Sequence, residues 1–193
     1  MKTLKSMFLS LNIAILLNFM FATVSKAELL SFGLVPVIGY EQVTALLPTR
    51  HTKSRLFYGG IATIGVPLIS GELEYLLATD TEKFSDPTLT IKDTVHRARL
   101  GLRSSFHLTP LLSLFARAGA QASRNKLQIT DAGGNISTSS NAWKFAPYAG
   151  AGLKLRVSTK FALLADVVVV FGNFPSMANN TYQTSAGFAI FLP

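Results

Sequence analysis

Charged and apolar side chains alternate along residues 94–108 (TVHRARLGLRSSFHL) of this 193-residue chain. Three arginines share the odd positions: Arg97, Arg99 and Arg103. Apolar residues occupy the even positions Ala98, Leu100, Leu102 and Phe106. A period of two puts successive side chains on opposite faces of a strand, so the segment predicts a β-strand with one cationic and one apolar face. Any sheet that contains this strand must place these two faces in different environments.

The period of two continues beyond Glu28. Turn residues divide the chain into eight predicted strands, at 29–41, 54–66, 68–79, 93–107, 110–123, 142–157, 159–172 and 181–192. The connections after the second, fourth and sixth strands are short. The other four are longer polar loops, at 42–53, 80–92, 124–141 and 173–180. Short turns at one end and long loops at the other are typical of an up-and-down barrel that spans an outer membrane.

The N-terminal segment has the pattern of a signal peptide. Two lysines precede the apolar stretch 7–22, and Ser25 and Ala27 place small residues at the −3 and −1 positions of a cleavage site. The stretch is shorter than the roughly 20 residues that a membrane-spanning helix needs. We therefore expect residues 1–27 to be a signal peptide for Sec-type export, cleaved after Ala27, and residues 28–193 to form one outer-membrane β-barrel domain.

A soluble lipocalin-like barrel would also have eight meandering strands. The composition of the two strand faces therefore has to distinguish a soluble barrel from a transmembrane one. Glycines gather on the charged face, as expected where a narrow interior leaves little room for side chains: Gly33, Gly39, Gly101, Gly119, Gly150, Gly152 and Gly187. Aromatic residues gather near the strand ends of the apolar face: Phe32, Tyr40, Phe106, Trp143, Phe161, Phe171 and Tyr182. These features favour an all-β, eight-stranded antiparallel transmembrane barrel with lipid around its apolar face. A soluble secreted barrel is the alternative.

The charged face should then line the lumen. An arginine on the lipid face would cost about 2–4 kcal/mol near the membrane midplane, and an unpaired buried charge is strongly destabilising. We expect Glu72 and Glu74 to pair with the arginines of the next strand. The predicted lumen charge network comprises Glu41, Glu72, Glu74, Arg97, Arg99, Arg103, Arg117, Lys144, Lys154, Arg156 and Asp166. Pro36 and Pro147 fall inside two strands, where we expect local bulges because proline has no N–H to donate.

The long loops carry a predicted basic rim at the outer surface. Its residues are Arg50, His51, Lys53, Lys92, Arg124 and Lys126. Such a rim could bind the phosphates of lipopolysaccharide, or it could simply keep the loops solvated. Without Lys2, Lys5 and Lys26 the net charge of +8 falls to +5 and is spread along the chain, so no nucleic-acid site is expected.

The chain from residue 28 to 193 resembles the small eight-stranded outer-membrane barrels of the OmpA/OmpX type, the opacity-protein-like surface antigens of Gram-negative bacteria. The segments LTPLLSLFARAGAQ (108–121) and APYAGAGLKLRVSTKFALLADV (146–167) carry the resemblance, because each joins a tight turn to an amphipathic strand. The resemblance implies assembly by the barrel-insertion machinery, contact with outer-membrane lipid and surface loops that vary with function. We expect a monomer.

Catalytic and metal-binding functions find little support. None of the three histidines, His51, His96 and His107, begins a local His-x-Ser arrangement of the kind that would suggest nucleophilic catalysis. They are also scattered, and the chain has no cysteine, so neither a metal site nor another cofactor is expected. We therefore predict a protein that is not an enzyme. A lipid A-modifying enzyme is a weaker alternative.

Eight strands leave an interior that side chains fill, which argues against a wide porin-like channel. The leading hypothesis is an outer-membrane protein that supports envelope integrity and presents four surface loops for interaction. The alternative is a narrow transport path, either for ions through the charged lumen or for small hydrophobic solutes through a more apolar upper interior. The apolar residues that suggest the second path are Phe57, Ile61, Val168 and Val170.

Overall fold

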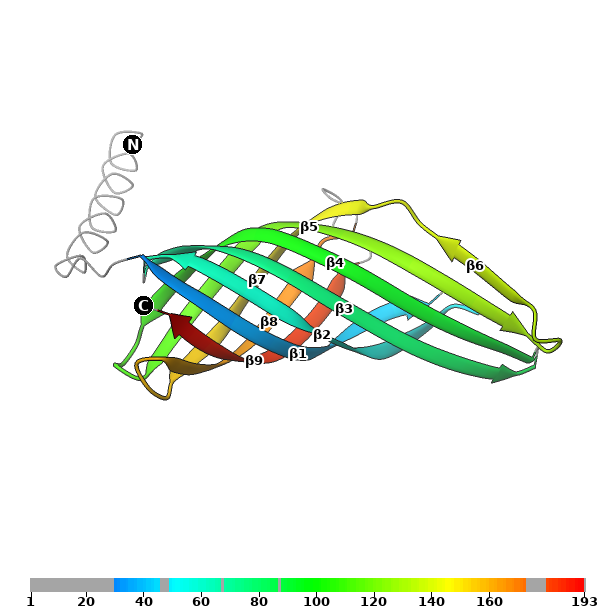
Figure 1. The fold of residues 1–193 in the computed structure, drawn as a ribbon, viewed down its shortest axis with the longest axis horizontal. Helices are drawn as coiled ribbons and strands as arrows, with labels where there is room; N and C mark the ends of the chain where they lie inside the picture. Colours follow the sequence, from blue (N-terminus) through cyan, green and yellow to red (C-terminus); the bar gives the residue numbers. More distant parts are fainter. Residues whose placement is uncertain (1–29, 46–48, 67, 87, 173–179, 193) are drawn as a thin grey trace, which may run out of the picture.

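The computed structural model describes residues 30–45, 49–66, 68–86, 88–172 and 180–192, so the predicted signal peptide lies outside the described residues. The strands are β1 (Ser31–Ala45), β2 (His51–Gly65), β3 (Ile69–Ser85), β4 (Thr88–His107), β5 (Leu112–Asp131), β6 (Ile136–Ser140), β7 (Lys144–Arg156), β8 (Phe161–Val170) and β9 (Thr181–Leu192) (Figure 1). No helix in this described part of the chain has the length and hydropathy needed to cross a membrane.

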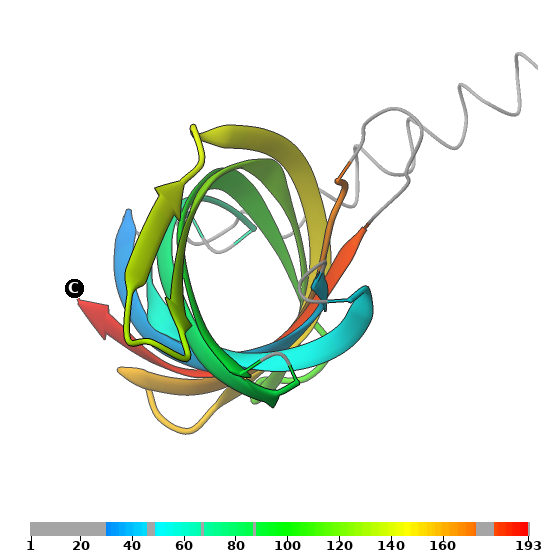
Figure 2. The same cartoon turned by 90° about the vertical axis from the view of Figure 1, so that its right-hand side faces the viewer.

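Eight strands close into a ring in which every pair is antiparallel. The ring runs β1, β2, β3, β4, β5, β7, β8, β9 and back to β1. Strand β6 pairs only with the distal part of β5 and lies outside the ring (Figure 2). The prediction of an all-β, eight-stranded antiparallel barrel is confirmed.

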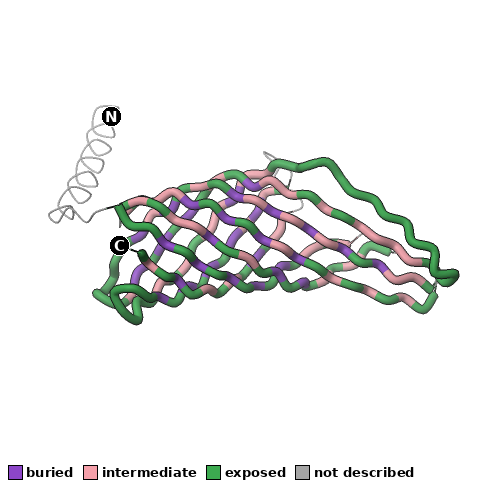
Figure 3. Tube along the Cα trace, viewed as in Figure 1, coloured by how far each residue is buried: buried purple, intermediate pink, exposed green. Residues whose placement is uncertain are grey.

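Buried and exposed positions alternate along the ring strands (Figure 3). In β8, for example, Ala162 and Leu164 are buried, whereas Phe161 and Leu163 are exposed. The alternation follows directly from the period of two in the sequence, because the pleat of a strand turns neighbouring side chains to opposite faces. The predicted face assignment therefore holds: the charged and glycine-rich face points inward.

The outer face is apolar over a continuous band. Leu100 and Leu102 of β4 are 68% and 65% exposed. All seven remaining strands of the ring also carry exposed apolar residues, which include Leu34, Ile38, Leu56, Leu73, Leu114, Leu153, Leu163, Val167 and Ile190. Exposed tyrosines lie toward the end with the long hairpins: Tyr40, Tyr58, Tyr75 and Tyr182. An apolar band with interfacial aromatic residues is the surface that a barrel presents to lipid.

Several strands extend beyond their predicted limits, so the predicted long loops are corrected. Residues 80–92 are not a loop, because β3 and β4 remain paired from Asp80↔Asp93 to Ser85↔Thr88. Most of 124–141 belongs to β5 and β6. Outward positions of the β3–β4 extension, such as Thr81, Lys83 and Thr90, are polar, and threonine is a residue that suits a strand. The 20 residues of β4 exceed the roughly 9–11 that cross a bilayer, so this hairpin projects beyond the membrane.

The expected bulges at Pro36 and Pro147 are absent, since the β1–β2 and β5–β7 registers run unbroken through both residues. The main-chain oxygen of Pro147 accepts a hydrogen bond from the N–H of Phe171, just past the end of β8. The N and C=O of one strand residue point to the same side, so the missing N–H of Pro147 faces this strand end. The barrel therefore accommodates this proline without a change of register.

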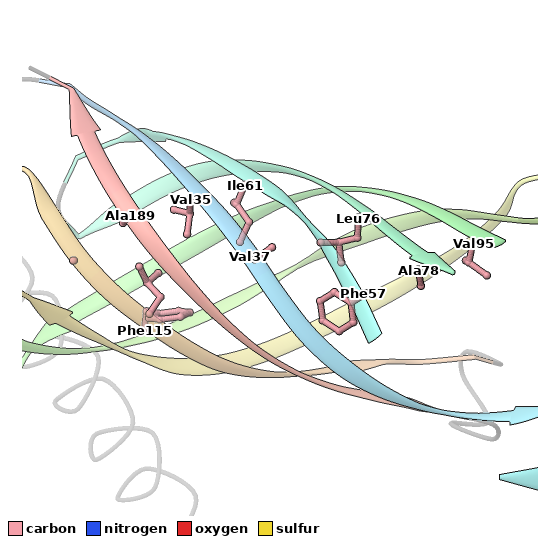
Figure 4. Close-up of a cluster of buried hydrophobic side chains, with 11 residues drawn as sticks. Val35, Val37, Phe57, Ile61, Leu76, Ala78, Val95, Phe115 and Ala189 are labelled. Atoms are coloured by element: carbon pink, nitrogen blue, oxygen red, sulfur yellow. The ribbon is translucent and has the colours of Figure 1, made fainter. Parts of the chain in front are cut away.

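Apolar side chains fill part of the interior (Figure 4). The cluster includes Val35, Val37, Phe57, Ile61, Leu76, Phe115 and Leu164. A cavity of only about 10 Å³ lies where this cluster meets the inward-facing Arg103 and Asp166. Such a volume holds about one water molecule, so the lumen is packed at this level.

Candidate functional site

A network of buried charges occupies the lumen, and its members balance. Five arginines are buried among the described residues: Arg55, Arg97, Arg99, Arg103 and Arg117. Five carboxylates are buried with them: Glu41, Glu72, Glu74, Asp93 and Asp166. We call these ten residues the lumen network. Its formal charge is zero, which is the condition under which buried ions can be tolerated.

Glu74 of β3 and Arg117 of β5 lie at the centre of the lumen network. Glu74 Oε2 is 3.1 Å from Arg99 Nη1 and 2.6 Å from Arg117 Nη2. Arg117 Nη1 also lies 3.3 Å from Asp166 Oδ2 of β8. One carboxylate and one guanidinium thus connect four strands of the ring, β3, β4, β5 and β8.

Glu72 is the second acceptor of β3. It pairs with Arg103 Nη2 at 3.0 Å and with Arg117 Nε at 3.4 Å, and Tyr148 of β7 donates its hydroxyl hydrogen to it at 2.7 Å. The guanidinium of Arg103 lies over the ring of Phe115 at 4.5 Å. Cation–π contacts of this kind add to the stability of desolvated guanidinium groups.

The absence of a side chain at Gly101 allows the hydroxyl group of Tyr148 to reach Glu72. A Cβ at Gly101 would lie 2.2 Å from the Tyr148 hydroxyl oxygen and 2.6 Å from the carbonyl oxygen of Ala118. Both distances are far below van der Waals contact. Gly101 therefore leaves the space through which Tyr148 crosses the lumen to Glu72.

Glu41 of β1 is the main acceptor in the upper part of the lumen network, which is the part nearer to the projecting hairpins. It accepts hydrogen bonds from Arg55 Nε at 2.5 Å, Arg97 Nη2 at 2.7 Å and Gln183 Nε2 at 2.8 Å. Arg55 Nη1 also donates to Asp93 at 2.6 Å.

Two glutamines connect the upper and central parts. Gln183 of β9 and Gln121 of β5 both accept hydrogen bonds from Arg99. The lumen network and its polar neighbours therefore draw side chains from all eight strands of the ring.

Eight of the eleven residues predicted for this network lie in it: Glu41, Glu72, Glu74, Arg97, Arg99, Arg103, Arg117 and Asp166. The carboxylate that pairs with Arg97 is Glu41, from a strand that is not its neighbour, and neither Glu72 nor Glu74 takes this role. Sequence reasoning did not identify Arg55 and Asp93. Their odd positions match those of the inward residues of the same strands, and that parity was the available signal.

The structure does not bring the remaining three predicted residues into the network. Lys144 and Arg156 are exposed because they are the first and last residues of β7, where long side chains reach water. Lys154 is half-buried, and its Nζ lies 5.7 Å from the centre of the Phe191 ring.

The predicted basic rim is mostly part of strands instead of loops. His51 and Lys53 belong to β2, Lys92 to β4, and Arg124 and Lys126 to β5. Only Arg50 lies outside a strand, as an exposed residue just before β2. The rim is therefore carried by paired strands that project from the barrel.

Part of this rim is neutralised by acidic residues of β3. Lys53 Nζ lies 2.8 Å from Asp80 and 2.9 Å from Glu82, and His51 Nε2 lies 3.1 Å from Glu82. A hydrogen bond to the Thr49 carbonyl and a second to Glu82 raise the pKa of His51. These side chains bridge β2 and β3 above Phe57↔Ala78, the last pair of their main-chain ladder.

The three histidines lie apart. His51 contacts Glu82, His96 Nδ1 is 2.7 Å from the Tyr75 hydroxyl on the outer face, and His107 is the last residue of β4. Across the described ranges, the side chains of His, Asp and Glu form no group of three or more that could hold a metal ion.

Comparisons with solved structures find the same fold. The attachment invasion locus protein Ail of Yersinia pestis, in complex with the heparin analogue sucrose octasulfate, is 14% identical over 83% of this chain and 99% of its own, with a TM-score of 0.56. Neisserial surface protein A is 14% identical over 84% and 99%, with a TM-score of 0.57. A major outer membrane protein from Thermus thermophilus is 10% identical over 86% and 100%, with a TM-score of 0.60.

The search of curated protein sequences gives no match. Residues 57–186, more than half of the chain, match the family described as the OmpA-like transmembrane domain. This match runs from within β2 to within β9 and includes eight of the ten residues of the lumen network. The expected resemblance to the small outer-membrane barrels is confirmed, and the chain is a bacterial outer-membrane β-barrel that belongs to the OmpA-like transmembrane domain family.

Proposed function

We propose that this protein is a non-enzymatic, monomeric outer-membrane barrel with a closed lumen, which supports envelope integrity and presents its projecting hairpins for interaction at the cell surface. The observation that carries the proposal is the lumen network, which is electroneutral and spans the barrel. A barrel filled in this way is a rigid element of the membrane and has no wide aqueous path.

The closed lumen is supported by the short contacts of the network. Arginine–carboxylate distances of 2.5–3.4 Å leave little room for a hydrated ion between Glu41 and Glu72. To pass, an ion would have to separate buried pairs, and breaking such a pair costs about 3–5 kcal/mol. The apolar cluster beside the network adds a second barrier that carries no charge.

Planar-bilayer recording tests the closed lumen. The purified protein should insert and give no discrete conductance steps. Steps that disappear when Arg99 or Glu74 is neutralised would support the alternative of a narrow ion path and would refute the closed lumen. A Lys126→Gln variant serves as the matched control, because Lys126 lies on the outer side of β5 and outside the lumen network.

The surface role is supported by the length and charge of the hairpins. Strands β3, β4 and β5 project beyond the apolar band and carry exposed cations at Lys92, Arg124 and Lys126. Ail, which has the same fold, binds a sulfated heparin analogue. We infer that these three cations attract lipopolysaccharide phosphates.

Binding of lipopolysaccharide and of its dephosphorylated form, at two salt concentrations, tests this inference. Loss of phosphate, added salt or the triple change to glutamine should each weaken binding. Equal binding of the two forms would contradict it.

Envelope integrity and processing can be tested in cells. A strain without the gene should leak periplasmic protein or become sensitive to detergent, and the lipid A mass spectrum should be the same with and without the protein. A changed spectrum would favour the lipid-modifying enzyme.

Mass spectrometry of the protein from outer membranes should give an N-terminus at Glu28, as Sec export and cleavage after Ala27 require.

A further inference from the structure

The outward end of the lumen holds a cavity of about 390 Å³, which we call the mouth cavity. Seven of the eight ring strands line it, through residues that include Val43, Arg55, Arg97, Gln121, Lys144, Val170 and Gln183. The cavity therefore lies within the ring and above the lumen network. Its volume is in the range of about 300–1,000 Å³ that is common for small-molecule sites.

The charged residues that line the mouth cavity are all cations. Arg55 and Arg97 belong to its lining, and so does Lys144, but no aspartate or glutamate of the described residues does. The ten charges of the lumen network cancel, and Glu41 holds both arginines from below. Lys144 lies outside that balance. It therefore adds a positive charge at the wall of the cavity.

Two buried polar atoms of the lining have no hydrogen-bond partner among the residues that the structure describes. Arg97 is only 4% exposed, and its Nη2 donates to Glu41, but its Nη1 has no acceptor. Asn125 Oδ1 is a buried acceptor without a donor. A buried donor without an acceptor costs roughly 1–3 kcal/mol, and more when it is charged. The two atoms therefore favour a ligand that brings an anionic acceptor and a hydroxyl donor.

We propose that the mouth cavity binds a small soluble molecule that carries one oxyanion group and several hydroxyl groups, the class of sugar phosphates and hydroxy acids. The oxyanion accepts hydrogen bonds from Arg97 Nη1 and Lys144 Nζ, and a ligand hydroxyl donates to Asn125 Oδ1. A lipid headgroup would lie outside the barrel wall, whereas this cavity is inside it. The proposal goes beyond the surface role above, because the ligand binds at the mouth without crossing the closed lumen.

Calorimetric titration of the folded protein in detergent micelles tests the site with glucose 6-phosphate as the probe. The sugar phosphate should bind, glucose should not, and inorganic phosphate should bind more weakly. The fluorescence of Trp143, the only tryptophan of the chain and the neighbour of Lys144, provides a second signal. No binding of glucose 6-phosphate, or equal binding of glucose, would overturn the proposal.

Variants locate the site. Arg97→Gln should weaken binding roughly tenfold or more, as expected for a lost hydrogen bond to an ionised group. Lys144→Gln and Asn125→Ala should each weaken it severalfold without touching an ion pair of the lumen network, so they keep the test valid if Arg97→Gln does not fold. Lys83→Gln removes the same charge from an exposed position of β3 outside the cavity and should leave the affinity unchanged.

Two results would overturn the proposal. One is an equal loss of affinity in Lys83→Gln and Lys144→Gln, which would mean diffuse attraction to a basic surface. The other is tight binding of lipopolysaccharide that displaces the sugar phosphate, which would assign the phosphate chemistry to a lipid.

Discussion

Replacing Glu41 by glutamine should destabilise the barrel by about 3–5 kcal/mol, the cost of leaving a buried charge without its partner. Glu41 accepts from Arg55 at 2.5 Å and from Arg97 at 2.7 Å. After the change, Arg55 retains Asp93 at 2.6 Å, but Arg97 retains no carboxylate among the described residues. The lumen network would then carry one uncompensated positive charge.

A double-mutant cycle with Arg97→Met isolates this effect. The single Arg97→Met change leaves Glu41 with Arg55 and Gln183 as partners, so it should cost less than Glu41→Gln. In the double variant the charges balance again, and the coupling energy should be about 1–3 kcal/mol, as expected for directly interacting residues.

Free energies of unfolding can be measured by urea titration in lipid vesicles, with heat-modifiable gel migration to count folded molecules. Glu82→Gln is the control, because its ion pairs are partly exposed and should contribute at most about 1 kcal/mol. Additivity of the Glu41 and Arg97 changes within about 0.5 kcal/mol would refute the pairing across the lumen.

Three further predictions concern the lipid-facing surface of the barrel, the close contact between Gly101 and Tyr148, and the His51 contact in the projecting hairpins. Leu100→Arg should cost about 2–4 kcal/mol in a urea titration, because the new charge would face the lipid, and a smaller loss would contradict the face assignment. Gly101→Ala should cost about 1–3 kcal/mol in the same assay through overlap with the Tyr148 hydroxyl, whereas Gly60→Ala, whose Cβ would meet only an oxygen at 3.9 Å, should be tolerated. The pKa of His51 is raised in the folded protein, so its stabilisation should be complete below its ordinary pKa of 6.5 and disappear as the pH rises through the raised value. Melting temperatures followed against pH should show this loss in the native protein but not in His51→Gln, and identical profiles would exclude the His51 contact.

The period of two, the alternation of short and long connections and the composition of the two faces together predicted the barrel and its inward face. Leu100 and Arg99 differ in environment only because they are successive residues of one strand, and that relation is readable from sequence. Pairing between neighbouring strands was also readable in part, since it correctly placed Glu74 beside Arg99. These are local consequences of strand geometry.

Contacts across the lumen were not predictable in the same way. Arg97 of β4 meets Glu41 of β1 because the ring closes and the strands tilt, and neither property follows from the alternation. The outer strand limits were missed for a different reason. Above the membrane the outward positions of β3 and β4 are polar, so the apolar signal of the outer face stops at a point where the main-chain pairing continues to Ser85↔Thr88.

The central claim is that hydrocarbon surrounds the leucine-bearing face while the charged face lines the lumen. Leu163 and Leu164 test it directly, because these adjacent residues of β8 have the same side chain and opposite environments, 47% and 8% exposed. Nuclear Overhauser spectroscopy of methyl-labelled protein in lipid nanodiscs should give acyl-chain contacts at the Leu163 methyl groups and none at those of Leu164. Acyl-chain contacts at Leu164, or water contacts alone at Leu163, would contradict the inside-out arrangement.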